Sequence, residues 1–463
     1  MSDTAFEDDL YRKGSARADT DPEFVAELRQ AISDLDADLI RQLLAPLHAA
    51  DIADVLEQLS AGQQGILAEL TPDIFSGDVL AEMDPGTREV VMDYLHPSHL
   101  AAAIAELDSD DATEVVEELN AVRRAAVLAE ISDINREAVE YSLAFDDETA
   151  GRLMQREFVA APDFWTIGHA IDHMRESADD LPDKFHDLFV VDTGFRPVGE
   201  IPVCRLLSAQ REVHLTDIME PPRILVKPET DQEEVAYLFQ KYHLVSAPVV
   251  DSAGRLTGML TVEDMVDVIQ TENKEDMLAL AGVNEADLAD TVVRSVRSRA
   301  PWLLVNLFTA ILASGVISMF EGALERIVAL AVLMPIVASM GGNAGTQSLA
   351  VAVRAIAERD LTAANSMRVI WRELATGAIN GVIFAALIST VTLLWFKDWE
   401  IAAVIGIAMI VNLSLAGLSG ILIPLGLVRA GADPAVASSV FVTTVTDVVG
   451  FLAFLGLATI VLL

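Results

Sequence analysis

The sequence is poor in cysteine and in basic side chains, and each shortage excludes something. Cys204 is the only cysteine, so no disulfide can form within one chain, as expected in a reducing cytosol. The 31 Lys and Arg side chains are outnumbered by 71 Asp and Glu, which gives a formal net charge of -40. A field of this sign repels nucleic acid and anionic lipid heads and attracts cations. We therefore expect no nucleic-acid partner.

Several sequence motifs are also missing. There is no GxxxxGK followed by Ser or Thr, which argues against ATP-driven pumping, and no HExxH, CxxC or GxSxG motif. The acidic, polar residues 1–21 have no basic region followed by an apolar stretch, so we expect no signal peptide and a disordered segment. Nothing in the sequence requires an enzyme.

Hydrophobicity and charge are distributed unevenly along the chain. Hydrophobic residues make up 52% of the 463 residues and the mean hydropathy is positive, which is typical of a membrane protein. From Arg299 onward there are 8 basic and 9 acidic side chains, which leaves 23 basic and 62 acidic ones in the first 298 residues. An acidic soluble half therefore precedes a nearly neutral apolar half. Attraction of cations and a solubilised or salt-adapted surface both explain this acidity.

A 12-residue repeat runs from Leu35 to Ile131. Apolar residues fall in register at nearly every twelfth position, and most are followed eight or nine residues later by an apolar pair such as Val115-Val116. Asp or Pro near the start of each unit suits a helix N-terminus. The pattern predicts one short helix and a turn per unit, stacked as an all-α superhelix over residues 22–150.

Residues 151–275 contain two similar stretches with the order β-α-β-β-α. The second reads Ala247-Pro-Val-Val-Asp251 and then turns at Gly254, and the first is a weaker copy. The order resembles a tandem pair of α/β CBS domains, at about 151–215 and 216–275. Such pairs are regulatory and often bind adenine nucleotides. The resemblance makes Thr261 and Asp264 of the second copy candidate nucleotide ligands, and ATP a candidate cofactor.

Residues 276–298 are expected to form a polar connecting helix, and residues 299–463 a five-helix transmembrane domain. Five apolar runs are each long enough to cross about 30 Å of hydrocarbon; they cover residues 301–320, 327–353, 375–396, 401–427 and 436–463. With the N-terminal half in the cytosol, eight Lys or Arg side chains lie on inner flanks and two in outer loops. This bias predicts a multi-pass protein in a lipid bilayer, with its C-terminus outside.

One carboxylate is expected well inside a span. Asp447 lies in the last run, and no Lys, Arg or His lies inside any run to pair with it. Burying an ionised carboxylate there costs at least about 2.5–3.5 kcal/mol, which favours a cation ligand over a structural Asp bonded to a neighbouring helix. The other eight acidic residues of this half, Glu373 included, are expected in loops, at span ends or in flanks.

The second run contains Pro335 and then Gly341-Gly-Asn343-Ala-Gly345-Thr-Gln347. Its glycines and amides predict a broken or thinned helix at mid-membrane, with close helix packing through small residues as the alternative. Amide and carboxylate oxygens suit a hard cation such as Mg²⁺. Because one Asp per chain is few ligands for a divalent ion, we expect a homodimer with the pore on its two-fold axis.

The helical region, the CBS pair, the five spans, the Gly-Gly-Asn-Ala-Gly-Thr-Gln segment and Asp447 together resemble the MgtE family from about residue 35 to the end. The resemblance implies a Mg²⁺-selective channel that imports Mg²⁺ across the bacterial plasma membrane as a homodimer. Mg²⁺ bound between acidic cytosolic domains would close it. Two alternatives stay open: a less selective divalent cation channel passing Co²⁺ or Mn²⁺, and a membrane-anchored sensor of Mg²⁺ or nucleotide.

The resemblance also implies ligands, although each acidic sensor ligand has a solvated surface carboxylate as its alternative. Asp447, Asn343 and Thr443 would line the pore, and Asp433 would lie at its cytosolic mouth. Two positions depart from the family pattern: His243 replaces an acidic residue and Glu114 replaces a shorter Asp. Asp264 could bind either a metal ion or the ribose of a nucleotide. The implied sensor ligands are Asp110, Asp111, Glu114, Gly151 through its carbonyl, Asp231, Glu233, Asp264, Glu272, Glu275 and Asp276.

Overall fold

The computed structural model describes residues 22–178, 181–182, 184–281, 283, 292–357, 359, 361, 365–435 and 438–463. The chain divides into two compact units, Met1–Ile269 and Gln270–Leu463. The predicted disordered segment 1–21, residues 282 and 284–291 of the predicted connecting helix, and residues 436–437 of the fifth apolar run lie outside the described residues.

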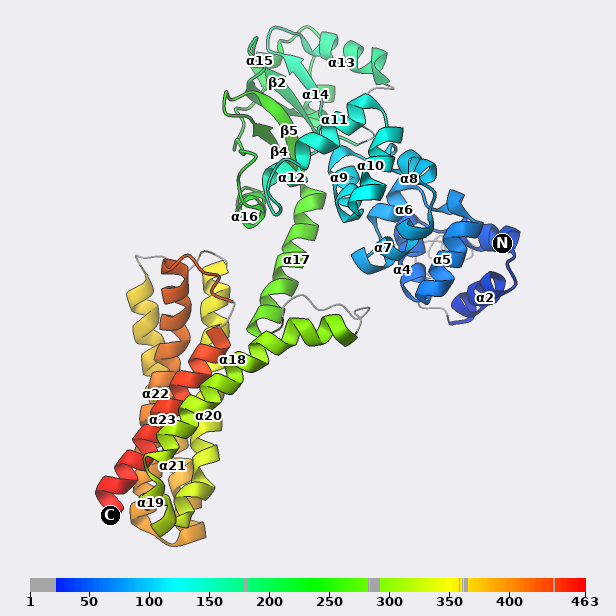
Figure 1. Cartoon of the computed structure of the whole chain (residues 1–463). Coiled ribbons are helices and arrows are strands. Elements are labelled where there is room, and N and C mark those ends of the chain that lie inside the picture. The colour runs from blue at the N-terminus through cyan, green and yellow to red at the C-terminus, as the bar shows by residue number, and fades with distance from the viewer. Residues whose placement is uncertain are drawn as a thin grey trace, which may run out of the picture. The chain divides into compact units, whose positions relative to one another are not determined.

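The first unit begins with a solenoid of short helices, which confirms the predicted superhelix (Figure 1). Helix starts recur every 12 residues at 37, 49, 61, 85, 97, 109, 121 and 133, and a 3-10 turn with a short helix replaces the unit expected near 73. The elements are α2 (Pro22–Ser33), α3 (Ala37–Leu44), α4 (Ala49–Glu57), α5 (Ala61–Leu70), η2 (Pro72–Ile74), α6 (Gly77–Ala81), α7 (Pro85–Tyr94), α8 (Pro97–Ile104), α9 (Ser109–Glu118), α10 (Ala121–Glu130) and α11 (Asp133–Ser142).

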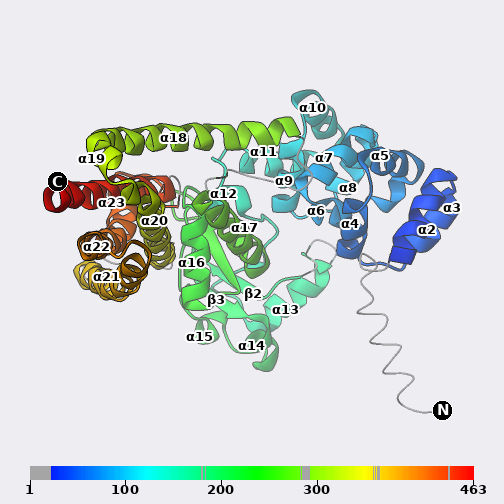
Figure 2. The ribbon, with the colours of Figure 1, turned by 90° about the horizontal axis from the view of Figure 1, so that it is seen from below.

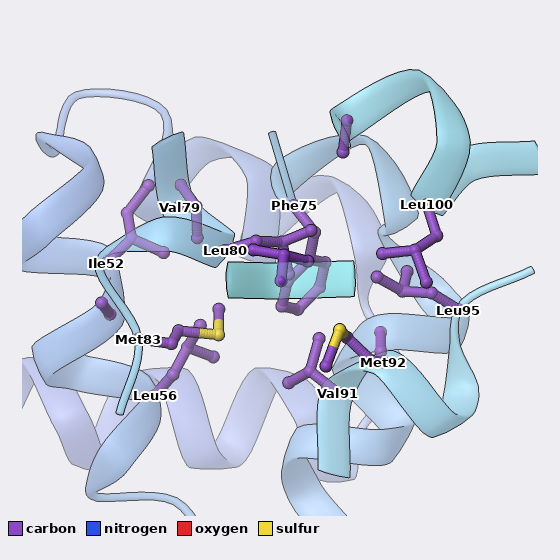
Figure 3. Packing of buried hydrophobic residues seen from close by; sticks show 14 of the residues in the cluster. Ile52, Leu56, Phe75, Val79, Leu80, Met83, Val91, Met92, Leu95 and Leu100 are labelled. Carbon is purple, nitrogen blue, oxygen red and sulfur yellow. The ribbon is translucent and has the colours of Figure 1, made fainter. Parts of the chain in front are cut away.

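Capping and burial explain these short helices. Asp84 accepts hydrogen bonds from the backbone N–H groups of Gly86 and Thr87 at the start of α7, as an N-cap residue does. The apolar pairs of the repeat point inward and form one continuous core (Figure 3). Arg124 of α10 donates to the carbonyl oxygens of Val116 and Leu119 at the end of α9. Scarce arginines thus satisfy helix C-termini that would otherwise lack donors.

Two small sheets follow, as expected of a CBS pair. The sheets have the orders β1-β2-β3 and β4-β5, with β2–β3 and β4–β5 as antiparallel hairpins. In both hairpins an Asp caps the turn: Asp192 accepts from the backbone N–H of Arg196, and Asp251 from that of Arg255. The elements are α12 (Ala150–Leu153), β1 (Ala160–Pro162), α13 (Ile167–Glu176), β2 (Asp187–Val191), β3 (Pro197–Pro202), α14 (Val203–Ser208), α15 (Leu215–Ile218), α16 (Gln232–Tyr242), β4 (Ser246–Val250) and β5 (Leu256–Thr261).

One helix joins the two units. α17 (Val262–Leu280) runs without interruption through the predicted boundary between the second CBS domain and the connecting helix at residue 275. The second unit continues with α18 (Val292–Ser318), α19 (Glu321–Arg326), α20 (Val328–Ala357), α21 (Ser366–Phe396), α22 (Trp399–Arg429) and α23 (Ser438–Leu462). Five of its helices are long and apolar enough to cross a membrane. α22 packs against α20, α21 and α23, and Figure 2 shows α21 and α22 nearly end on.

The predicted break in the second apolar run is wrong, because α20 is one helix from Val328 to Ala357 with Pro335 inside it. Its glycines lie where neighbouring helices come closest. A Cβ on Gly345 would lie 2.5 Å from Cγ1 of Val442 on α23, and one on Gly341 would overlap the Asn412 side chain of α22. Close packing through small residues, the alternative reading of the motif, offsets the poor helix propensity of glycine.

Candidate cation sites

Three of the predicted sensor carboxylates lie close together in the first unit. Asp110 and Asp111 open α9, and Asp264 lies in the first turn of α17. Burial raises the pKa of Asp110 well above its usual range, and the charge of Asp264 raises it further. Burial and then Asp264 raise the pKa of Asp111 to about 7, and burial raises that of Asp264 to about 6. Ionising these three carboxyl groups together is costly, and a bound cation would offset that cost.

The surroundings of Asp110 test whether a metal ion fits. Its Oδ2 accepts a 3.3 Å hydrogen bond from Nε2 of Gln155, whereas its buried Oδ1 has no hydrogen-bond partner among the described residues. Gln155 is also paired through its backbone with Met259 of β5, which ties α9 to the strand that ends at Thr261. A buried carboxylate oxygen without a donor is chemically suited to a hard cation.

Asp264 is held by the other candidate nucleotide ligand. Its Oδ2 accepts hydrogen bonds from the Thr261 hydroxyl at 2.6 Å and from the Thr261 backbone N–H at 3.1 Å. A ribose hydroxyl would compete with Thr261 for this oxygen. The two carboxylates of α9 favour a divalent cation near Asp264 over the phosphates of a bare nucleotide.

Glu114 has an ion-pair partner that the sequence did not predict. Nη2 of Arg88, which is 1% exposed, lies 2.5 Å from Glu114, and its Nε lies 3.0 Å from Glu118. Glu114 therefore neutralises a buried cation of α7. Asp267 of α17 is not among the predicted ligands, yet burial and then Glu114 raise its pKa. Asp267 follows Asp264 by three residues on one helix, and this spacing, which puts two side chains on the same face, could have identified it from the sequence.

A second predicted group lies where α12 meets α16. Thr149 and Asp231 form an isolated β-bridge, and the Gly151 N–H donates to the Pro228 carbonyl at 2.8 Å. Asp231 is the N-cap of α16 and accepts from the Glu233 backbone N–H, so one of its oxygens already has a structural role. His243, the departure from the family pattern, is the left-handed C-cap of the same helix with φ 52°.

The remaining sensor candidates belong to the second unit. Glu272, Glu275 and Asp276 lie on the last turns of α17. Burial raises the pKa of Asp276, and Asp433 and then Glu272 raise it further. Asp433 accepts a 2.7 Å hydrogen bond from the Ala435 backbone N–H in the turn between α22 and α23. The structure thus brings Asp276 and Asp433 near each other.

These acidic groups are not closed around a common point. In the part of the chain that the structure describes, no three His, Cys, Asp or Glu side chains are arranged to hold a metal ion. Binding Mg²⁺ at either group would require the carboxylates to move toward the ion. Such movement couples ion binding to a change of conformation.

The predicted pore residues share one depth of the helix bundle. Gly341 of α20 and Gly450 of α23 both contact Asn412, and Gly345 contacts Val442 and Thr446. Asn343 lies between those two glycines of α20, so it is level with Asp447 of α23. Asn343 and Thr443 are exposed in the single chain and Asp447 is half-buried. No hydrogen bond or ion pair joins the Asp447 side chain to another described residue.

Two polar residues of the membrane half were missed or misplaced. Asn412 is fully buried in α22, and its Nδ2 donates to the Val337 carbonyl of α20 at 2.8 Å. Glu373, expected in a loop or flank, lies inside α21 and is 9% exposed, so that expectation is wrong. The third apolar run begins at residue 375 by hydropathy, whereas α21 begins nine residues earlier, at Ser366. A single Asn or Glu gives no sequence signal of which helix it faces.

The fold and these sites define a multi-pass membrane protein of the divalent cation transporter class with a cytosolic N-terminal domain. Family models match the MgtE intracellular N domain at residues 47–148, the CBS domain at 150–212 and 215–271, and the MgtE divalent cation transporter domain at 334–457. Transporters are not a class of enzyme.

Relatives of known name match over most of the chain. Magnesium transporter MgtE of Thermus thermophilus is 30% identical over 442 residues, which are 94% of this chain and 98% of that protein. Magnesium transporter MgtE of Enterococcus faecalis is 34% identical over 316 residues, 68% of this chain and 70% of that protein. The chain belongs to the MgtE family. A crystal structure of the cytosolic domain of the Mg²⁺ channel MgtE in complex with ATP covers 53% of this chain and 99% of its own, at 27% identity and a TM-score of 0.49.

Proposed function

We propose that this protein is a homodimeric, Mg²⁺-selective channel that imports Mg²⁺ and is closed by Mg²⁺ bound to its acidic cytosolic domains. The observation that carries the proposal is the polar surface of α20 and α23, which bears Asn343, Thr443 and Asp447 on the outside of a bundle of apolar helices. The membrane potential drives entry. Moving a divalent ion across 100 mV releases about 4.6 kcal/mol, twice the value for a single charge.

The homodimer follows from the exposure of this polar surface. Asn343, Thr346, Gln347 and Thr443 are all exposed in the single chain. Polar groups at this depth are stable only against protein or water, because lipid offers no hydrogen-bond partner. A second copy related by a two-fold axis covers the surface and brings a second Asp447 to the ion path. The bias of Lys and Arg supports an outside C-terminus.

Closure by Mg²⁺ rests on electrostatic repulsion. The carboxylates of Asp110, Asp111 and Asp264 repel one another when ionised, and so do those of Asp276 and Asp433. A divalent cation removes the repulsion and favours the compact arrangement. High internal Mg²⁺ therefore stabilises the closed channel, which is a negative feedback on import.

The deciding experiment measures Mg²⁺ influx into proteoliposomes for the wild type and Asp447→Asn, which keeps the size of the side chain and removes its charge. Glu325→Gln is the matched control, because Glu325 is exposed on α19 outside the candidate spans. We expect Asp447→Asn to lose Mg²⁺ influx or its preference for Mg²⁺ over Co²⁺ and Mn²⁺, while Glu325→Gln behaves as the wild type.

Other outcomes would change the assignment. Unchanged influx and selectivity in Asp447→Asn would remove this residue from the filter. If the wild type passes Co²⁺ and Mn²⁺ as readily as Mg²⁺, the less selective channel is correct. A wild type that carries no divalent cation at any internal Mg²⁺ concentration would leave the membrane-anchored sensor as the function.

ATP is the second ligand that we propose for the CBS pair, with Thr261 and Asp264 as its candidate contacts. Because the carboxylates of α9 disfavour bare phosphates, we expect nucleotide to bind as its Mg²⁺ complex. Isothermal titration of the full chain with ATP, with and without Mg²⁺, tests this. Binding that is lost in Thr261→Ala supports the site, and equal binding by this variant would place the nucleotide elsewhere.

A further inference from the structure

The carboxyl group of Glu373 is buried in the membrane half without touching the predicted ion path. Its Oε2 accepts a 3.1 Å hydrogen bond from the Ser348 hydroxyl of α20. Its Oε1 lies 3.3 Å from Nη2 of Arg372, whose side chain is mostly exposed. A buried carboxylate among membrane helices is costly and is retained where it has a function. Its cross-helix partner, Ser348, directly follows the polar segment from Asn343 to Gln347.

Very small residues surround this hydrogen bond. A Cβ on Gly420 of α22 would lie 2.7 Å from Cβ of Ser348, and one on Gly417 would lie 2.8 Å from the Glu373 carbonyl oxygen. Farther along α21, a Cβ on Gly377 would lie 2.5 Å from the Leu413 carbonyl oxygen. The backbones of α20 and α21 therefore both approach α22 as closely as they can. In such packing the hydrogen bond fixes the position of α20 along and around its axis.

The hydrogen bond joins two helices that otherwise meet little. α21 packs mainly on α22, and α20 packs on α22 and α23. The other side of α20 meets α23 through Gly345, which contacts Val442 and Thr446. A shift or rotation of α20 therefore changes how Asn343 lies relative to Asp447.

We propose that Glu373 is a positioning residue for ion selection: through Ser348 it holds α20 so that the segment from Asn343 to Gln347 lies level with Asp447. This inference rests on the proposed function of the chain as a Mg²⁺ channel. Glu373 acts through the hydrogen bond and not through its charge on the ion. Its amide counterpart, which still accepts from the Ser348 hydroxyl, should therefore serve nearly as well.

The test is a double-mutant cycle in the full chain, reconstituted in proteoliposomes, with Glu373→Ala, Ser348→Ala and the pair combined. The measured quantities are the half-saturating Mg²⁺ concentration, the maximal rate and the ratio of Mg²⁺ to Co²⁺ rates. A hydrogen bond to a charged group supports an effect of about tenfold on that ratio. We expect each single variant to change the ratio of Mg²⁺ to Co²⁺ rates by this amount and the double variant to change it no further. In Glu373→Gln the ratio should lie within about threefold of the wild-type value.

Thr376→Ala is the matched control, because Thr376 is exposed one turn along α21 and its hydroxyl bonds to the Arg372 carbonyl of its own helix. It should keep the wild-type ratio. A wild-type ratio in folded Glu373→Ala would overturn the inference. Impairment of Glu373→Gln equal to that of Glu373→Ala would assign the effect to charge, and multiplicative effects in the double variant would show that the two residues act independently.

A second readout does not need conductance. Spin labels at Val351→Cys of α20 and Phe441→Cys of α23, both at exposed positions, report the distance between these helices in a Cys204→Ser background. We expect the distance distribution to shift or broaden in Ser348→Ala and not in Thr376→Ala. An unchanged distribution would overturn the inference even if the channel proposal held. Absence of Mg²⁺ influx in the wild type would instead refute the proposed function.

Discussion

Raising the pH from 5 to 8 without divalent cations should destabilise the helical and CBS unit, and Mg²⁺ should reverse the effect. The reason is the group formed by Asp110, Asp111 and Asp264. Burial and then the charge of Asp264 place the pKa of Asp111 at about 7, and burial places that of Asp264 at about 6, against ordinary values of 3.8. A carboxyl whose pKa is higher in the folded state contributes stability below its unfolded pKa. That contribution is lost as the pH rises through 6 to 7.

The size of the effect follows from the pKa shifts of Asp111 and Asp264. Each pKa unit corresponds to about 1.4 kcal/mol, which gives about 4 kcal/mol for Asp111 and about 3 kcal/mol for Asp264 taken alone. Part of each loss already occurs below pH 5, so the step from pH 5 to 8 is worth about 3 kcal/mol for Asp111 and about 1 kcal/mol for Asp264. Because the two groups titrate as a coupled pair, we expect a combined loss of about 3–4 kcal/mol. Mg²⁺ binds the ionised carboxylates and competes with protons, so its stabilisation should be small at pH 5 and large at pH 8.

Hydrogen exchange of the full chain in detergent measures this locally, in peptides that cover α9 and the first turns of α17. The comparison is EDTA against Mg²⁺ between pH 5 and 8, after correction for the intrinsic pH dependence of exchange. Asp111→Asn should flatten the pH dependence and weaken the Mg²⁺ response, whereas Asp93→Asn, at an exposed position on α7, should change neither. Protection that increases toward pH 8 in EDTA, or equal Mg²⁺ stabilisation at both pH values, would refute the reasoning.

Three further predictions concern single positions. Arg88→Met should destabilise the solenoid by about 2–4 kcal/mol, because it leaves carboxylates without their buried cation; unchanged hydrogen exchange in α7 would contradict this. Phe195 and Gly254 both have positive φ, so Phe195→Gly should stabilise the first CBS domain by up to about 1 kcal/mol and Gly254→Ala should destabilise the second by a similar amount. A lower unfolding temperature for Phe195→Gly, or a higher one for Gly254→Ala, would contradict this. Gly345→Ala should reduce Mg²⁺ influx per folded protein, because its Cβ would lie 2.5 Å from Val442. Gly315→Ala is the control, because a Cβ there meets nothing within 4 Å, and equal influx in the two variants would contradict the packing argument.

The repeats made most of the cytosolic fold predictable. A period of 12 residues determines where each helix starts, because every unit must bury its own apolar pair against the next. The unit near residue 73 departs from the pattern for a local reason. Ser76 caps a new helix that begins at Gly77, within the helix expected there, so the structure has a 3-10 turn and a five-residue helix instead.

The membrane half was less predictable, because the same residue types serve packing and polarity. The glycines beside Asn343 predicted a broken helix, yet they let α20 approach its neighbours. The family resemblance implied Asp110, Asp111 and Asp264 as ligands, and the structure places these three carboxylates close together. The resemblance could not show that Arg88, 26 positions before Glu114, would take that carboxylate as its partner. Pairings of this kind depend on the stacking of the repeats and leave no local pattern.

Burial separates the polar residues of the membrane half into two kinds that composition cannot distinguish. Asn412 and Glu373 are buried and bond to neighbouring helices, so they fix the packing of the bundle. Asn343 and Thr443 have the same chemistry but are exposed at a depth where lipid satisfies no polar group. The side chains of Glu373 and Asn412 thus bond to helices of the same chain, although Asn412 Oδ1 has no partner among the described residues, whereas the exposed polar groups need a second copy or water. The boundary between the two kinds runs along α20, which is why a hydrogen bond on its far side should affect ion selection.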